Sequence, residues 1–315
     1  MIAQSIAAGH RTVPSDFAVH SCHCYFLQAG TSSAPILYHI ERLRDGRSFA
    51  ARTVQARQQG KCIFTVTMSF VKDNAGGKKT LQHAVPIPEG KLKEIPEDPP
   101  WANDNVLEKS KYQGQEDPDD PPIGPWITAA TRITSSPTIP TRQVHQWIRA
   151  RGTISSPYTS HVEALAYMSD SYFLFTIGRI HDVWRLINLP PSQISSLPAA
   201  TQKNFRKIFE SEKGIGAPID DVAYWEKRPH LGMTVSLDHT IYFHEPRKVK
   251  ADEWMFCEME SPWAGDGRGV VVQRIFARDG TLLATCVQEG LLRLRQDVDG
   301  GGNDQGVTEK AKAKL

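Results

Sequence analysis

The sequence predicts an α+β protein that contains two copies of one module, each an antiparallel sheet wrapped around a helix. Three observations predict this fold: strand motifs that recur roughly 220 residues apart, a Pro- and acid-rich stretch between the copies, and an apolar helical stretch ahead of the second copy. A repeat of this spacing is too long for a solenoid unit. It indicates two homologous domains packed as one pseudo-symmetric body.

The first module is expected over residues 1–75. Small apolar side chains at helical spacing predict a buried helix over 1–8. An aromatic strand is predicted at 21–30, and residues 36–70 alternate and then run apolar between Gly-containing turns, which is typical of an antiparallel meander. Because no strand precedes the helix, we expect this module to lack its first strand.

Residues 76–142 have a different character: they are rich in Pro and acidic residues and show no periodicity, which predicts a linker or surface insertion. The second module is expected over 143–297. Its stretch 161–175 is apolar nearly all the way round, so a helix there has to be enclosed by other elements. The strands that would enclose it are predicted at 231–247, 253–261, 269–278 and 281–293.

The two copies share the order of their motifs. Each has an aromatic strand with a histidine, then an Asp-Gly-Arg turn, at Asp45–Arg47 and at Asp266–Arg268, then an Ala-Arg hairpin that closes on Gly60 or Gly280. A helix embraced by an antiparallel sheet, present twice, describes a double hotdog fold. Because the second copy has polar residues where the first has packing residues, we expect the second copy to carry the chemistry.

Composition excludes several classes of protein. The formal charge is +2 at pH 7, and no Lys- or Arg-rich stripe with interleaved aromatic residues is present, so a nucleic-acid partner is not expected. No apolar run approaches the roughly 20 residues of a membrane span. The stretch at 1–13 lacks a basic segment before its apolar part, which predicts a protein that is soluble and not secreted.

The five cysteines are too few and too scattered for a disulfide framework, so we expect reduced thiols in the core. On a regular strand His20, Cys22 and Cys24 would share one face, which is a conceivable metal trio. No second cluster supplies further ligands, and buried small residues are the ordinary interpretation of such cysteines. We therefore predict no metal site.

Two polar residues interrupt apolar elements of the second copy. Asp170 lies inside or at the end of the predicted helix, where a carboxylate is costly to bury unless it is paired, hydrogen-bonded or used; the alternative is a residue at the C-terminal end of the helix that points to water. Gln288 stands in an apolar strand where the first copy has Met68 or Ser69, and a buried amide needs a hydrogen bond. The alternative for Gln288 is a polar residue on an edge strand.

A hydroxyl precedes the aromatic strand of the second copy. Ser236 and Asp238 are two residues apart on a strand, so their side chains should share a face while His239 points the other way. This arrangement makes Asp238 and His239 a poor catalytic dyad.

Several long motifs resemble the acyl-CoA thioesterase II family, whose members are double hotdog enzymes. They are RLRDGRSFAARTVQA with IFTVTMSF in the first copy, and SLDHTIYFHEP with GRGVVVQRIFARDGTLLATCVQEGLLR in the second, and the resemblance covers about 1–70 and 143–293. It implies that Asp170, Ser236 and Gln288 hold the hydrolytic water. It also implies a dimer or larger homo-oligomer. No cofactor is expected, because coenzyme A is part of the substrate.

The predicted function is hydrolysis of a fatty acyl-CoA thioester to the free acid and coenzyme A, with water as the nucleophile. No histidine belongs to the trio, and a nucleophilic serine would need one as its base. Asp170 would accept a proton from water while Ser236 and Gln288 orient it. Two alternatives stay open at this point: a hotdog enoyl-CoA hydratase, and a non-catalytic protein that binds acyl-CoA.

The last three residues, Ala313-Lys314-Leu315, resemble the Ser-Lys-Leu peroxisomal address. The Gly-rich tail 298–315 is expected to be flexible enough to present them to an import receptor. We therefore predict a peroxisomal matrix protein, with the cytoplasm as the alternative location.

Overall fold

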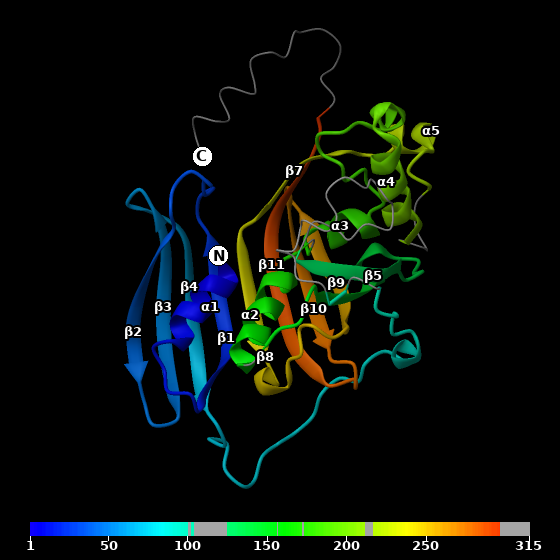
Figure 1. The fold of residues 1–315 in the computed structure, drawn as a ribbon. Helices are drawn as coiled ribbons and strands as arrows, with labels where there is room; N and C mark the ends of the chain where they lie inside the picture. The colour runs from blue at the N-terminus through cyan, green and yellow to red at the C-terminus, as the bar shows by residue number, and fades with distance from the viewer. Residues whose placement is uncertain (100–101, 104–124, 156, 172, 212–216, 297–315) are drawn as a thin grey trace.

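The computed structural model describes residues 1–99, 102–103, 125–155, 157–171, 173–211 and 217–296 (Figure 1). The N-terminal half contains α1 (Ile2–His10), β1 (Phe17–Phe26), β2 (Leu37–Asp45), β3 (Phe49–Gln58), β4 (Lys61–Lys72) and the 3-10 helix η1 (Lys91–Lys93). The C-terminal half begins with β5 (Trp126–Ile133), η3 (Ile139–Thr141), β6 (Gln143–Ala150), α2 (Tyr158–Ser169), α3 (Phe175–Ile180), η4 (Pro191–Ser196), α4 (Ala199–Ser211) and α5 (Val222–Glu226). It ends with β7 (Leu231–Ser236), β8 (Asp238–Phe243), η5 (Pro246–Lys248), β9 (Met255–Gly265), β10 (Arg268–Phe276) and β11 (Leu282–Leu294).

The described strands form one antiparallel sheet with the order β2-β3-β4-β1-β8-β11-β10-β9-β6-β5, and β7 pairs with β11 beside β8. The first four strands and the next four mirror each other about the β1–β8 contact, where Cys24 lies opposite His239. The predicted double hotdog fold is therefore confirmed, although the two predicted sheets join into one. They join because β1 and β8 each have a free edge, and pairing satisfies the backbone groups of both.

Helices α1 and α2 lie side by side against the same face of this sheet, one over each half (Figure 1). Their buried side chains, such as Ile6 and Leu165, pack onto strand residues such as Val66 and Ile241 in a single apolar core. His10 at the end of α1 approaches Glu163 of α2, with 3.6 Å between Nδ1 and Oε1. The side of the sheet that carries both helices is thus where polar groups from the two halves can meet.

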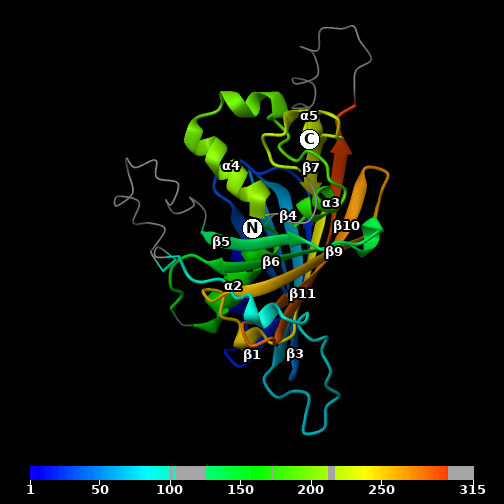
Figure 2. The same cartoon turned by 90° about the vertical axis from the view of Figure 1, so that its right-hand side faces the viewer.

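The stretch 76–142, predicted as a linker or insertion, contains β5, which pairs with β6 at the edge of the C-terminal half (Figure 2). Part of the stretch also covers the opposite face of the sheet, where Ala102 packs with Trp147, Trp254 and Phe276. The acid-rich composition conceals this role because the apolar partners lie on strands far along the chain. An acidic residue of the stretch also has a distant partner, because Asp98 forms an ion pair with the nearly buried guanidinium of Arg149.

The helix predicted over 161–175 is shorter in the structure, because α2 ends at Ser169 and Asp170 is its C-cap. A second helix, α3, begins at Phe175 after a turn. Leu174 fills the space above Gly290 of β11, where an added Cβ would collide with the Leu174 side chain. Burying Leu174 on the sheet therefore requires the chain to leave the axis of α2.

The segment between α3 and β7 folds over its own apolar cluster. Trp184, Ile194, Ile219 and Trp225 are buried there, and α4 and α5 surround them (Figure 2). The sequence reasoning did not predict this small helical subdomain. Within the described ranges, no helix is both long enough and apolar enough to cross a membrane.

Candidate active site

Asp170 and Gln288 meet between the end of α2 and the middle of β11. The side-chain Nε2 of Gln288 donates a hydrogen bond of 2.6 Å to Oδ1 of Asp170. Gln288 is fully buried, whereas Asp170 is half-buried. The Oε1 atom of Gln288 is also buried and has no hydrogen-bond partner among the described residues. Oε1 of Gln288 is therefore a buried acceptor that faces neither a donor among the described residues nor bulk water.

Ser236 is the last residue of β7 and lies opposite Gly290 on β11. Residues opposite each other in an antiparallel pair point to the same face, and so do residues two apart on one strand. The side chains of Ser236 and Gln288 are therefore on the face that carries α2 and α3. Ser236 is half-buried, and its hydroxyl makes no hydrogen bond to another described residue.

The strand register shifts by one residue between β7 and β8, because Ser236 lies opposite Gly290 while Thr240 lies opposite Val287. At the shift the backbone N–H of Glu289 donates to Oδ1 of Asp238, at 2.7 Å, in place of a strand carbonyl. Burial raises the pKa of Asp238, and this hydrogen bond acts in the opposite direction. Asp238 is thus engaged with the backbone and is not paired with His239.

His239 points into the core, so the prediction that it points away from the face of Ser236 is wrong. A regular strand alternates its side chains, but the bulge at the β7–β8 junction brings both Ser236 and His239 to the face beneath α2. His239 is fully buried, its Nε2 lies 2.9 Å from Oγ of Ser169, and its ring contacts Phe173 edge to face. Sequence reasoning had no signal for the bulge and therefore missed this residue.

The electrostatic setting of His239 is that of a neutral imidazole. Burial lowers its pKa to about 4, and the nearby charge of Asp170 raises it only in part. No ion pair of Asp170 with a basic side chain occurs among the described residues. A charged group near Asp170 is the N-terminal ammonium of Met1, whose pKa burial lowers and the charge of Asp170 raises. The carboxylate accepts one amide hydrogen bond, from Gln288, and its position suits a proton acceptor for water.

The possible metal trio on β1 does not assemble. The register of β1 shifts between Val19 and Ser21, so His20 points to the outer side, where its Nε2 lies 2.9 Å from Oγ of Ser69. Cys22 and Cys24 are buried in the core. Across the described part of the chain, no group of three His, Cys, Asp or Glu side chains is arranged to hold a metal. All five cysteines are free thiols, as predicted.

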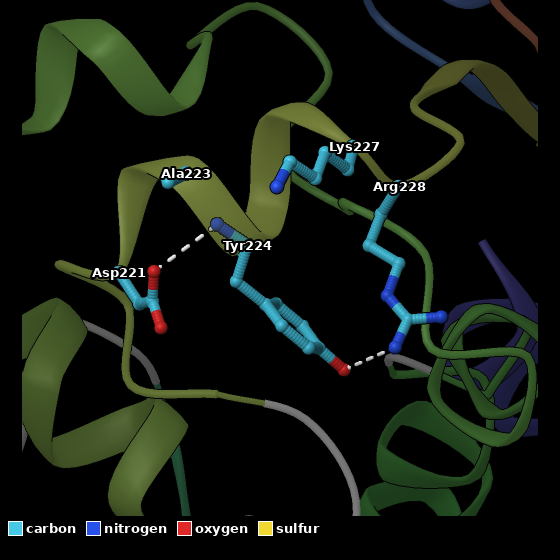
Figure 3. Close-up of a pocket in the computed structure, with 5 residues that line it drawn as sticks. All are labelled: Asp221, Ala223, Tyr224, Lys227 and Arg228. Carbon is cyan, nitrogen blue, oxygen red and sulfur yellow. Dashed lines mark hydrogen bonds between the residues drawn. The ribbon is translucent and has the colours of Figure 1, made fainter.

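A separate pocket lies on the helical subdomain, lined by Asp221, Ala223, Tyr224, Lys227 and Arg228 (Figure 3). Three of its polar side chains are already engaged: Asp221 caps α5 through the N–H of Tyr224, and the guanidinium of Arg228 donates to the Tyr224 hydroxyl at 2.7 Å. Arg228 also forms an ion pair with Asp182 at 3.1 Å. The pocket contains none of the three predicted site residues.

Two family models match the chain. The model described as the acyl-CoA thioesterase N-terminal domain matches residues 1–71, and the model described as the acyl-CoA thioesterase C-terminal domain matches residues 96–292. Together they span both halves of the sheet.

Named relatives agree with these matches. Acyl-coenzyme A thioesterase 8 of Mus musculus is 33% identical over 306 residues, which cover 95% of this chain and 80% of the relative. Acyl-CoA thioesterase 2 of Haemophilus influenzae is 29% identical over 303 residues, which cover 94% and 87%. The crystal structure of the acyl-CoA thioesterase II TesB2 from Mycobacterium marinum is similar with a TM-score of 0.59 and 27% identity, covering 93% of this chain and 88% of that one.

Proposed function

This chain belongs to the acyl-CoA thioesterase family and is a thioester hydrolase that acts on acyl-CoA, and we propose that it uses a water molecule held by Asp170, Ser236 and Gln288. In this proposal Asp170 is the general base, and Ser236 and Gln288 orient the water. The observation that carries the proposal is the buried Oε1 of Gln288, which has no partner among the described residues although its Nε2 contacts Asp170. A buried acceptor without a partner costs about 1–3 kcal/mol, which a bound water that donates to it would offset.

The reaction follows from these roles. Asp170 accepts a proton as the water oxygen attacks the thioester carbonyl carbon. The tetrahedral intermediate then expels the sulfur, the C–S bond breaks, and the proton held by Asp170 passes to the leaving thiolate. The products are a carboxylic acid and coenzyme A. Every atom comes from water and substrate, so the mechanism uses no cofactor.

Direct attack by the Ser236 hydroxyl is less well supported. A serine nucleophile needs a hydrogen-bonded base, and the hydroxyl of Ser236 contacts no imidazole. His239, which lies on the same face as Ser236, is bonded to Ser169 instead. Water therefore remains the nucleophile that the geometry favours.

The test compares Asp170→Asn with Asp252→Asn. Asp252 is a half-buried carboxylate at the other end of α2, where its Oδ2 accepts from the N–H of Ile154 and it approaches His161 at 3.4 Å. Thiol release from a series of acyl-CoA chain lengths should fall by about 10²–10⁴ in Asp170→Asn, the usual contribution of a positioned base, and change little in the control. Turnover near that of the wild type in a folded Asp170→Asn protein would end the assignment.

We propose a fatty acyl-CoA substrate and a homo-oligomer. The exposed apolar side chains Leu37 and Leu43 of edge strand β2, 60% and 51% exposed, support self-association. Sedimentation of wild type and Leu43→Glu would test the assembly, because a species of monomer mass in both would contradict it.

We further propose a peroxisomal location through an import receptor. The support is the terminal Ala313-Lys314-Leu315, which lies outside the described residues, and a Saccharomyces cerevisiae relative, 25% identical over 305 residues, named peroxisomal acyl-coenzyme A thioester hydrolase 1. A fluorescent reporter fused to residues 306–315 should collect in peroxisomes. A diffuse cytosolic signal would remove the proposal.

A further inference from the structure

A hydrogen-bonded chain connects β8 to the end of α2. The Ser169 hydroxyl donates to the carbonyl of Ala166 at 3.0 Å, so its oxygen accepts from Nε2–H of His239 at 2.9 Å. This assigns the proton of the neutral imidazole to Nε2 and leaves Nδ1 as an acceptor, which is buried and has no partner among the described residues. Ser169 is the residue before Asp170, so this series of hydrogen bonds ends directly beside the residue proposed as the general base.

The matching place in the N-terminal half is apolar. Met68 follows Gly60 by eight residues, as Gln288 follows Gly280, and Met68 lies opposite Cys22 on β1. Continuing the β8–β11 register by one step places His239 beside Gln288. His239 and Gln288 thus stand where the N-terminal half has the packing residues Cys22 and Met68, and the half with the polar pair is the one that contains Asp170. A histidine with a purely structural role would not need to occur in that half.

We propose that His239 is a positioning residue for Asp170, acting through the Ser169 hydroxyl at the end of α2. This inference rests on the proposed function of Asp170. The last turn of a helix leaves its carbonyls without intrahelical partners and frays easily. Holding Ser169 from the sheet side fixes this turn, while Gln288 holds the carboxylate itself. Two strands of one rigid sheet then determine both the backbone and the side chain of the base.

The other groups around His239 do not offer it an alternative role. Phe173 packs on its ring from the turn after α2, and Cys24 faces it from β1. The hydrogen bond to Cys22, and after it burial, raises the pKa of Cys24 well above its ordinary value, so this thiol is neutral. Burial raises the pKa of Cys286 on β11 well above its ordinary value, and the hydrogen bond between Cys286 and Ser169 acts in the opposite direction. The Ser169 hydroxyl is therefore the polar partner that His239 has in the described structure.

The experiment compares His239→Leu, His239→Gln and Ser169→Ala with the matched control His161→Leu. His161 is 5% exposed and lies in the first turn of α2, at the opposite end from Ser169. Its Nδ1 accepts a hydrogen bond from the N–H of Ala251 at 3.1 Å. Gln can donate from a position close to that of the imidazole Nε2. Turnover is followed by thiol release at a temperature where each variant is folded by circular dichroism.

We expect kcat to fall by about 10- to 100-fold in His239→Leu and Ser169→Ala with KM nearly unchanged, because small misplacements of a catalytic group carry losses of this order. His239→Gln should recover most of the loss. The double variant His239→Leu/Ser169→Ala should be no worse than either single variant, since both remove one contact. His161→Leu should lower the melting temperature but leave kcat close to wild type.

The inference is overturned if Ser169→Ala, which removes only the hydroxyl, keeps wild-type kcat, or if His161→Leu lowers kcat as much as His239→Leu does. Asp170→Asn measured alongside separates the two proposals. An inactive Asp170→Asn with fully active His239 and Ser169 variants would remove only the positioning role. An active Asp170→Asn would remove the proposed base as well.

Discussion

The side-chain amide of Gln288 donates to the carboxylate of Asp170 across 118 residues of sequence. One partner is on a central strand, and the other is the C-cap of the helix that lies over that strand. Because Gln288 is fully buried, its rotamer is held by the packing around it. The strand therefore sets the direction of the carboxylate.

Replacing Gln288 with Met removes this hydrogen bond at nearly constant volume. We expect kcat/KM to fall by about 10², the lower end of the range for a positioned catalytic group. Gln273→Met on the neighbouring strand β10 is the matched control, since Gln273 is 2% exposed and its Oε1 also lacks a partner among the described residues. Equal losses in both variants would show a general effect on the core.

Ser236 should matter through its hydroxyl alone. Ser236→Ala is expected to lower kcat by about 10-fold or more, whereas Ser236→Thr, which keeps the hydroxyl, should retain most of the activity. The unfolding midpoint should change little in either case, because the Ser236 hydroxyl makes no hydrogen bond to another described residue. Full activity of the alanine variant would remove Ser236 from the trio.

Gly290 leaves room for Leu174, and this packing affects both stability and the site. A Cβ at Gly290 would collide with Leu174 and lie 2.9 Å from the carbonyl oxygen of Val235. Gly290→Ala should therefore reduce the free energy of unfolding by about 1–3 kcal/mol, as overpacking commonly does. Activity should fall too, because Gly290 lies opposite Ser236. Gly76→Ala, at an exposed position, is the control for urea denaturation.

Two buried histidines should make the protein less stable in mild acid. Burial lowers the pKa of both His239 and His145 to about 4, from 6.5. Below pH 6.5 the unfolded chain binds protons at these residues and the folded chain does not, so stability falls as the pH drops from 6.5 toward 4. The loss reaches about 3 kcal/mol for each histidine.

Urea denaturation between pH 7 and pH 4.5 measures this loss. Carboxylates also titrate in this range, so the informative quantity is the difference between wild type and His239→Gln. The variant should have a shallower dependence of unfolding free energy on pH. Superimposable slopes would mean that His239 titrates alike in the folded and unfolded states.

The helix predicted over 161–175 was too long, because α2 ends at Ser169, whereas local sequence was enough to predict the strands of the two meanders. Their periodicity and turns are properties of neighbouring residues, and the Asp-Gly-Arg turns recur in both halves. The strand β5 and the cover that residue Ala102 provides over Trp147 were not predictable in this way, because their partners lie far along the chain.

By itself, the sequence determined the duplication, the fold class, the family resemblance and the identity of Asp170 and Gln288 as residues that interrupt apolar elements. Only the tertiary structure decided that these two share a hydrogen bond and that His239 joins them from β8. The physical reason is the one-residue shift between β7 and β8, which reverses the face of every following side chain. Such a shift is set by pairing with β11 and leaves no trace in the local pattern of residues.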